Sequence, residues 1–263
     1  ARYVLPDDAW TPIQPLLPAQ PDSPRAGRPW AEHRMIINGM FWILYSGAPC
    51  RDLPERYGPW ETVYNRFNRW SKSGVISIIF NKLLSSIDAH GLVDWSATAL
   101  ERKKHPDITG DNSRGRSRGG LAPKSIWLQT EVASVNIVLS PGQAHESQFA
   151  QRLLDNIGIQ RQTGTMKRRG HAVLADKAYS GHALRYELKN KGIKAVILEN
   201  QMKNGVGGRS QLDRVIYRKR NAVERCFGRL KEYHRVVTRY DKTARNYLAM
   251  VTLGCIRLFY QQV

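Results

Sequence analysis

The sequence predicts an α/β protein in which an all-helical N-terminal part precedes a mixed β-sheet flanked by helices. Apolar residues recur at helical spacing through residues 7–88, whereas strand-like apolar runs alternate with helical segments from residue 92 onward. Hydrophobic residues make up 41% of the 263 residues, which is typical of a folded chain and not of a disordered basic tail. We therefore expect two domains, residues 1–88 and residues 89–263.

The helix predicted for residues 60–73 has an apolar face opposite a basic face, and the basic face carries Arg66, Arg69 and Lys72. A short basic helix that follows another helix and a tight turn suits a helix-turn-helix unit that binds DNA. The alternative is an ordinary amphipathic helix with a solvated basic exterior. The helices predicted for the first domain cover residues 7–17, 31–46, 60–73 and 74–90.

The second domain alternates strands with helices, which implies a mixed sheet. Residues 102–120 form a polar loop that is dense in Arg, Lys, Gly and Ser, and its Arg114, Arg116 and Arg118 are candidate DNA contacts. The predicted strands are residues 92–99, 125–130, 132–139, 172–178 and 195–199, and the predicted helices are residues 148–157, 182–191, 217–231 and 246–260.

The charge of the chain indicates a polyanionic partner. Lys and Arg total 41 against 22 for Asp and Glu, so the formal net charge is +19. Such a surface binds nucleic acid, because each phosphate contact releases counterions. No apolar run is long enough to span a membrane, and no signal pattern appears at the N-terminus, so we expect no membrane partner and a cytoplasmic, nucleoid-associated protein.

The three cysteines give no sign of a zinc site or a disulfide framework. Cys50, Cys226 and Cys255 lie far apart, and the sequence contains no CxxC motif or Cys/His cluster. Their low and odd number suits a reducing cytoplasm, where they are expected to act as small buried apolar residues.

Four functional side chains share one stripe of the helix predicted for residues 217–231. Tyr217, Arg220, Glu224 and Lys231 fall within roughly 60° of one another at about 100° per residue. A carboxylate between two cations suits a site that holds a divalent metal against a phosphate. The alternative is a solvated face with ion pairs four residues apart.

Asp94 and Asp176 supply two further carboxylates, each in a predicted apolar strand. A buried acid is costly unless it is paired or bound to metal, and a divalent cation would relieve the repulsion between two such acids. With Glu224 they form a set of hard oxygen ligands, which favours two Mg²⁺ or Mn²⁺ ions over zinc. The alternative is that both aspartates cap turns at strand ends.

The order Asp94, Asp176, Glu224 resembles the DDE triad of bacterial insertion-sequence transposases. The spacing Y-x2-R-x3-E-x6-K of residues 217–231 matches the signature of that superfamily without a gap. Trp95 departs from the small residue that is usual in this branch. The chain is most similar to the IS Five family in the segments of residues 53–70, 115–121, 140–147, 173–179, 223–231 and 238–242.

The resemblance implies a ribonuclease-H-like catalytic domain in which Asp94, Asp176 and Glu224 bind two Mg²⁺ ions. It implies cleavage at terminal inverted repeats and joining of the 3′ hydroxyls to target DNA. Tyr217, Arg220 and Lys231 would contact the DNA. Because two transposon ends must be paired, a homodimer or higher oligomer is expected. A metal-dependent nuclease that does not join strands and a catalytically inactive DNA-binding relic are the alternatives.

Overall fold

Two units share the chain in the computed structural model. The first joins Ala1–Leu83 to Leu230–Val263, and the second covers Leu84–Arg229. The helices after residue 230, which we expected in the second domain, therefore pack with the N-terminal helices. The structure describes residues 3–19, 30–104, 116–117, 120–121, 124–130, 134–140, 146–155, 159–161, 163–167, 170–198, 213–238, 241 and 243–260.

Helices α2 (His33–Ser46), α3 (Trp60–Ser73), α9 (His234–Thr238) and α10 (Ala244–Phe259) form the core of the first unit. α10 is buried along most of its length because apolar side chains cover it on all sides, and it contacts the other three helices. α2 ends at Gly47, whose φ of 67° is a left-handed conformation that favours glycine.

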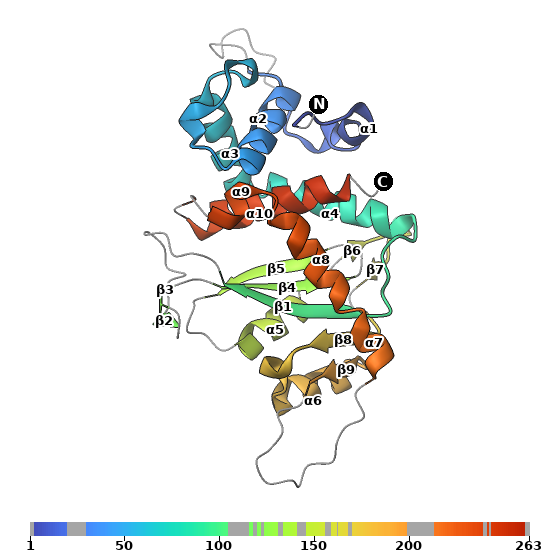
Figure 1. The fold of residues 1–263 in the computed structure, drawn as a ribbon. Coiled ribbons are helices and arrows are strands. Elements are labelled where there is room, and N and C mark those ends of the chain that lie inside the picture. The colour runs from blue at the N-terminus through green and yellow to red at the C-terminus, as the bar shows by residue number, and fades with distance from the viewer. Residues whose placement is uncertain are drawn as a thin grey trace. The chain divides into compact units, whose positions relative to one another are not determined.

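The start of the chain departs from the single helix that we predicted for residues 7–17. α1 (Asp7–Trp10) is one turn long, and a separate 3-10 turn follows at Gln14–Leu16. Pro15 explains the break, because proline lacks an N–H group and its ring clashes with the carbonyl four residues earlier. α4 (Val75–Ala89), which Figure 1 labels, contains the boundary between the two units at residues 83 and 84.

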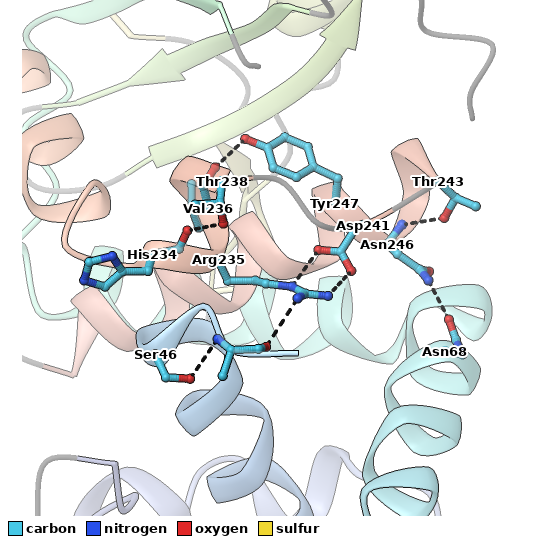
Figure 2. Close-up of polar contacts among 11 residues, drawn as sticks. Ser46, Asn68, His234, Arg235, Val236, Thr238, Asp241, Thr243, Asn246 and Tyr247 are labelled. Carbon is cyan, nitrogen blue, oxygen red and sulfur yellow. Dashed lines mark hydrogen bonds and ion pairs between the residues drawn. The ribbon is translucent and has the colours of Figure 1, made fainter. Parts of the chain in front are cut away.

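A buried ion pair joins the C-terminal helices of the first unit to the end of α2. Arg235 donates from Nε and Nη2 to the two carboxylate oxygens of Asp241, each at 3.2 Å, and from Nη1 to the Ala48 carbonyl oxygen at 3.5 Å. The two side chains are only 6% and 4% exposed. Figure 2 shows this cluster beside the Tyr247 hydroxyl, which donates to the Val236 carbonyl oxygen at 3.2 Å.

A second buried polar contact joins α2 to α3. The Arg66 guanidinium donates to His33 Nδ1 at 2.8 Å, so the ring proton lies on Nε2, which donates to the Pro18 carbonyl oxygen at 2.9 Å. Arg66 is 5% exposed and its guanidinium lies over the rings of Trp30 and Trp70. This side chain, which we expected to face DNA, therefore packs inside the first unit.

The remaining basic residues of α3 lie as predicted. Arg69 and Lys72 are both exposed, and the Arg69 guanidinium lies 5.2 Å from the centre of the Trp30 ring. The apolar face of the helix, with Val63, Phe67 and Trp70, is buried. The predicted division of this helix into an apolar and a basic face is confirmed for these residues.

The second unit contains a five-stranded mixed sheet with the order β5-β4-β1-β8-β9. β1 pairs with β4 and β4 with β5 in antiparallel fashion, whereas β1, β8 and β9 run parallel. This sheet and the preceding helices confirm the predicted ribonuclease-H-like α/β class (Figure 1). The five strands are β1 (Thr98–Lys104), β4 (Lys124–Gln129), β5 (Ser134–Ser140), β8 (Ala172–Ala175) and β9 (Lys194–Ile197).

Helices cover the sheet, and two short strand pairs lie outside it. α5 (Glu146–Asp155) packs on β4 and β5, and α6 (His182–Asn190) packs on β9. Within the described part of the chain, no helix is long and apolar enough to cross a bilayer. The two short pairs are β2 (Arg116–Ser117) with β3 (Gly120–Leu121) and β6 (Ile159–Gln160) with β7 (Met166–Lys167).

Two predicted elements of the second unit that carry site residues have clearly different bounds in the structure. The strand that we expected at residues 92–99 begins only at Thr98, because residues before it form a turn. The helix that we expected at residues 217–231 is divided into α7 (Arg214–Arg218) and α8 (Asn221–Leu230). The single stripe that the sequence predicted on one helix is therefore interrupted.

We predict that the Asp241→Asn substitution lowers the free energy of unfolding by about 3–5 kcal/mol, because it removes the carboxylate charge that lies against the buried Arg235 guanidinium. Urea denaturation would measure the loss. Asp7→Asn is the matched control, since Asp7 pairs with Arg34 but its side chain is 90% exposed, and we expect almost no change there. Equal effects of the two substitutions would contradict the structure.

We also predict that the first unit is sensitive to acid through His33. Burial lowers the pKa of His33 from its ordinary 6.5, the Pro18 carbonyl opposes the shift, and the charge of Arg66 adds to it. The unfolded chain therefore binds the proton more readily, so this contribution to stability is complete above pH 6.5 and is lost on acidification. His33→Gln should show a shallower loss of stability between about pH 7 and about pH 5 in urea titrations. Parallel curves for the two proteins would exclude this role.

Candidate functional site

The two predicted aspartates both accept hydrogen bonds from turns. Asp94 lies four residues before β1, and its Oδ1 accepts from the Ser96 backbone N–H at 2.8 Å. Asp176 follows β8 directly, and its Oδ1 accepts from the Ala178 N–H at 2.9 Å as the cap of the 3-10 turn Lys177–Tyr179. The turn-capping alternative thus describes part of what both residues do.

The turn around Asp94 explains why β1 starts late. A short acidic side chain that bonds to the backbone two residues on competes with strand pairing. Asp94 Oδ2 also accepts from the Ser96 hydroxyl at 2.9 Å and from Lys219 Nζ at 2.6 Å. Burial by itself raises the pKa of Asp94, but the bonds from Lys219 and Ser96 outweigh it and hold the pKa below its ordinary value.

Glu101 lies in β1 and is brought to Asp176 by the register of the parallel strands. β1 pairs with β8 so that Thr98 faces Val173 and Ala99 faces Leu174. The same offset of 75 residues places Glu101 in line with Asp176 at the end of β8. The Glu101 side chain is only 12% exposed, so this strand carries a mostly buried acid.

Arg220 provides the charge that balances this acid. Its Nη2 donates to Glu101 Oε2 at 2.5 Å, and its side chain is 18% exposed. Burial by itself lowers the pKa of Arg220, but the charges of Glu101, Tyr217 and Asp176 raise it above its ordinary value. The charge of Asp176 thus acts on the same guanidinium, but more weakly than the charge of Glu101.

Tyr217 completes the surroundings of Arg220. The Arg220 guanidinium carbon lies 6.0 Å from the centre of the Tyr217 ring. The Tyr217 hydroxyl is buried, and no described residue forms a hydrogen bond with it. A buried hydroxyl without a partner is unfavourable, so this atom offers a contact to an additional ligand.

The segment that carries these residues is tied to the sheet at its start. Asp213 caps α7 by accepting from the Ile216 N–H at 3.1 Å, and its second oxygen accepts from Lys194 Nζ of β9 at 2.8 Å. Lys219 and Arg220 then form the turn between α7 and α8. The ion pair between Asp213 and Lys194 therefore fixes the start of α7 against β9.

The structure describes some of the other predicted site residues fully, some only in their backbone and some not at all. Glu224 is the fourth residue of α8, and the structure does not describe its side chain. Lys231 is exposed and follows the end of α8. Arg116 lies in β2, and its side chain is likewise not described. Arg114 and Arg118 lie outside the described residues.

The donor set suits hard divalent cations but is only partly described. Carboxylate oxygens of Glu101 and Asp176 and a tyrosine hydroxyl are ligands or contacts that Mg²⁺ or Mn²⁺ and a phosphate accept. Within the described residues, no group of three or more His, Cys, Asp or Glu side chains could hold a metal ion. A third carboxylate must therefore come from a side chain such as Glu224, whose placement is not described.

The sequence analysis missed Glu101. Its signal was present, since Glu101 follows the buried apolar residues Ala99 and Leu100, where a solvated acid is unexpected. The signal was hidden because the strand was expected to end at residue 99, which left Glu101 between the predicted strand and the polar loop of residues 102–120. Only the observed extent of β1, Thr98–Lys104, places this acid within the sheet.

Trp95, the residue next to Asp94, points into the second unit. It is 7% exposed, and its indole Nε1–H donates to Asp88 Oδ1 at 2.5 Å. Arg161 donates from Nε to Asp88 Oδ2 at 2.8 Å. Burial by itself raises the pKa of Asp88, but the bonds from Arg161 and Trp95 hold it below its ordinary value. The bulky ring thus anchors the turn and leaves Asp94 and Ser96 facing Lys219.

Comparison with known families decides the class of the protein. A family model described as a transposase DDE domain matches residues 85–259, which is most of the chain. The chain belongs to the DDE transposase family. A second model, described as that of a transposase of the IS4/5 family, matches residues 5–80 of the transposase.

Two curated relatives are similar to parts of this chain, and one of them belongs to an insertion element. The transposase is 32% identical over 107 residues to an uncharacterized 16.2 kDa protein of insertion element IS402 from Burkholderia cepacia, covering 38% of this chain and 71% of that protein. It is 29% identical over 127 residues to the uncharacterized protein y4sN of Sinorhizobium fredii, covering 48% of this chain and 94% of that protein.

Among solved structures, the transposase shows a distant likeness to Mos1 transposase. The paired-end complex with the left transposon end gives 12% identity and a TM-score of 0.28, covering 81% of this chain and 82% of that one. The strand transfer complex gives 11% identity and a TM-score of 0.29, covering 89% and 78%. TM-scores this low do not establish a common fold. The fold is supported by the strand order of the chain itself.

We predict that Trp95→Phe lowers the free energy of unfolding by about 1.5–3 kcal/mol, because it removes a donor to the buried Asp88 carboxylate while keeping the ring. Thermal and urea denaturation would measure the loss. An additional Asp88→Asn substitution should then cost less in the Trp95→Phe background than alone, since the two side chains interact. Additive effects would contradict the hydrogen bond.

Proposed function

We propose that the transposase binds the terminal inverted repeats of an insertion sequence, cleaves at their ends and joins the 3′ hydroxyls to target DNA. The observation that carries this proposal is the register of β1 and β8, which places Glu101 of β1 in line with Asp176 directly after β8, together with the ion pair between Glu101 and Arg220. The net charge of +19 supports double-stranded DNA as the substrate.

The catalytic acids in this proposal are Glu101, Asp176 and Glu224. The sequence suggested Asp94 as the first acid, but Asp94 lies in the turn before β1, whereas Glu101 lies within β1 in line with Asp176. Two Mg²⁺ or Mn²⁺ ions held by these acids would supply Lewis-acid stabilisation of the attacking and leaving oxygens. Acids fixed by paired strands would hold their oxygens in place, with little rearrangement during the reaction.

Basic and hydroxyl groups beside the acids would hold the DNA backbone. Arg220 offers a planar guanidinium for bidentate phosphate contact, and the Tyr217 hydroxyl offers a donor that has no partner among the described residues. Lys231, which is exposed, would add a further phosphate contact. In the first unit, the exposed Arg69 and Lys72 of α3 would contact duplex DNA.

The proposed reaction requires two transposon ends at once, so we expect a homodimer or a higher oligomer on DNA. Each end would be held while its 3′ hydroxyl attacks the target, with no covalent bond between protein and DNA. The unit of residues 1–83 with residues 230–263 offers the helical surface for pairing or for end recognition.

We predict that Glu101→Gln, Asp176→Asn and Glu224→Gln each abolish cleavage, because each removes one negative charge from the proposed metal site. Labelled candidate element ends would be incubated with Mg²⁺ or Mn²⁺, and cut and joined products would be separated by size. DNA binding in Ca²⁺ should persist in all three variants. Asp155→Asn is the matched control, since it removes an acid of the same unit that pairs with Lys191 on the surface.

The products of the intact protein separate the alternatives. Joined products that need metal and all three acids support a transposase with strand transfer. Shorter fragments without joined products indicate a nuclease, and tight binding of authentic ends without cutting indicates an inactive relic. Normal cleavage by any one of the three variants contradicts its place in the acid set.

A further inference from the structure

Two successive basic residues between α7 and α8 are each held by a different acid of the second unit. Lys219 Nζ donates to Asp94 Oδ2 and to the Ser96 hydroxyl oxygen, both at 2.6 Å. Arg220, the next residue, donates to Glu101 at 2.5 Å. α8 begins one residue later, at Asn221. Both contacts therefore act on the point from which the helix with Glu224 starts.

The oxygens of Asp94 are committed to this contact. Oδ1 accepts from the Ser96 backbone N–H, and Oδ2 accepts from the Ser96 hydroxyl and from Lys219. The arrangement fits a carboxylate that binds a lysine.

The turn that carries Asp94 is held in place by the contacts of the next residue, Trp95. Trp95 is bound through its indole to Asp88, and its carbonyl oxygen accepts from the His171 N–H at 2.8 Å. Lys167 Nζ lies 5.2 Å from the centre of the Trp95 ring. Because the residue between Asp94 and Ser96 is fixed in this way, both side chains are presented to Lys219 from a rigid support.

We propose that Asp94 is a positioning residue, which docks Lys219 together with Ser96 and thereby fixes the start of α8 and the place of Glu224. This inference rests on the proposed role of Glu224 as a catalytic acid. It assigns to Asp94 a function different from that of Glu101, although both acids hold neighbouring residues of one turn. The contact between Asp94 and Lys219 positions α8, so that Glu224 of this helix would lie near the acids Glu101 and Asp176.

Hydrogen exchange of the metal-free full-length protein tests the docking directly. Asp94→Asn keeps the shape of the side chain and an oxygen for the Ser96 N–H, but it removes the charge that binds Lys219. We expect the amides of residues 219–230 to exchange roughly two- to fivefold faster in this variant, as loss of a partly exposed ion pair allows. The combined Asp94→Lys and Lys219→Asp protein should restore slower exchange. Asp155→Asn is the matched control and should leave these amides unchanged.

Binding of Mn²⁺, measured by calorimetry, separates this proposal from a ligand role. Asp94→Asn should weaken Mn²⁺ binding by at most about tenfold, because it acts only through the placement of Glu224, whereas Glu101→Gln should lose most of its affinity. Unchanged exchange of residues 219–230 in Asp94→Asn overturns the positioning role, and so does a loss of Mn²⁺ affinity equal to that of Glu101→Gln. Failure of Glu101→Gln to affect cleavage would instead count against the proposed function, and the exchange result would be unaffected by it.

Discussion

The ion pair between Glu101 and Arg220 is the contact on which the candidate site depends. Both side chains are mostly buried, and a buried charge is tolerated only when a partner of opposite charge is held close to it. The pair joins β1 to the turn before α8, so the sheet and the helix meet at one fixed point. Asp176, at the end of the neighbouring parallel strand, lies within the field of the same guanidinium. This arrangement brings together two of the carboxylates that the proposed metal site requires.

Other contacts in the second unit fix the segments that precede Glu101 and Arg220. Asp88 fixes Trp95 and so the turn before β1, while Lys194 and Asp213 fix the start of α7. These contacts are charged or charge-assisted, and they connect elements that are distant in sequence. The site is therefore held together by ion pairs and charge-assisted hydrogen bonds between elements that pack around the apolar core.

The first unit follows a different principle. Its helices are held by burial of α10, and buried polar groups such as Arg235 and Asp241 are paired with each other. Arg66 shows the consequence, because its place on a basic face of α3 predicted solvent exposure, whereas stacking with Trp30 and Trp70 and bonding to His33 hold it inside. A helical pattern assigns a residue to a face, but the packing partners decide where the face ends.

The sequence by itself determined the helical N-terminal part, the mixed sheet, the net positive charge and the order of the acidic motifs, because these follow from periodicity, charge and spacing. It also indicated Asp176 and Arg220 as site residues. Only the tertiary structure decided that Glu101, and not Asp94, lies in line with Asp176, because that depends on where β1 begins and how it pairs with β8. Strand register and the partners of a buried charge are properties of distant residues brought together, and local sequence patterns do not contain them.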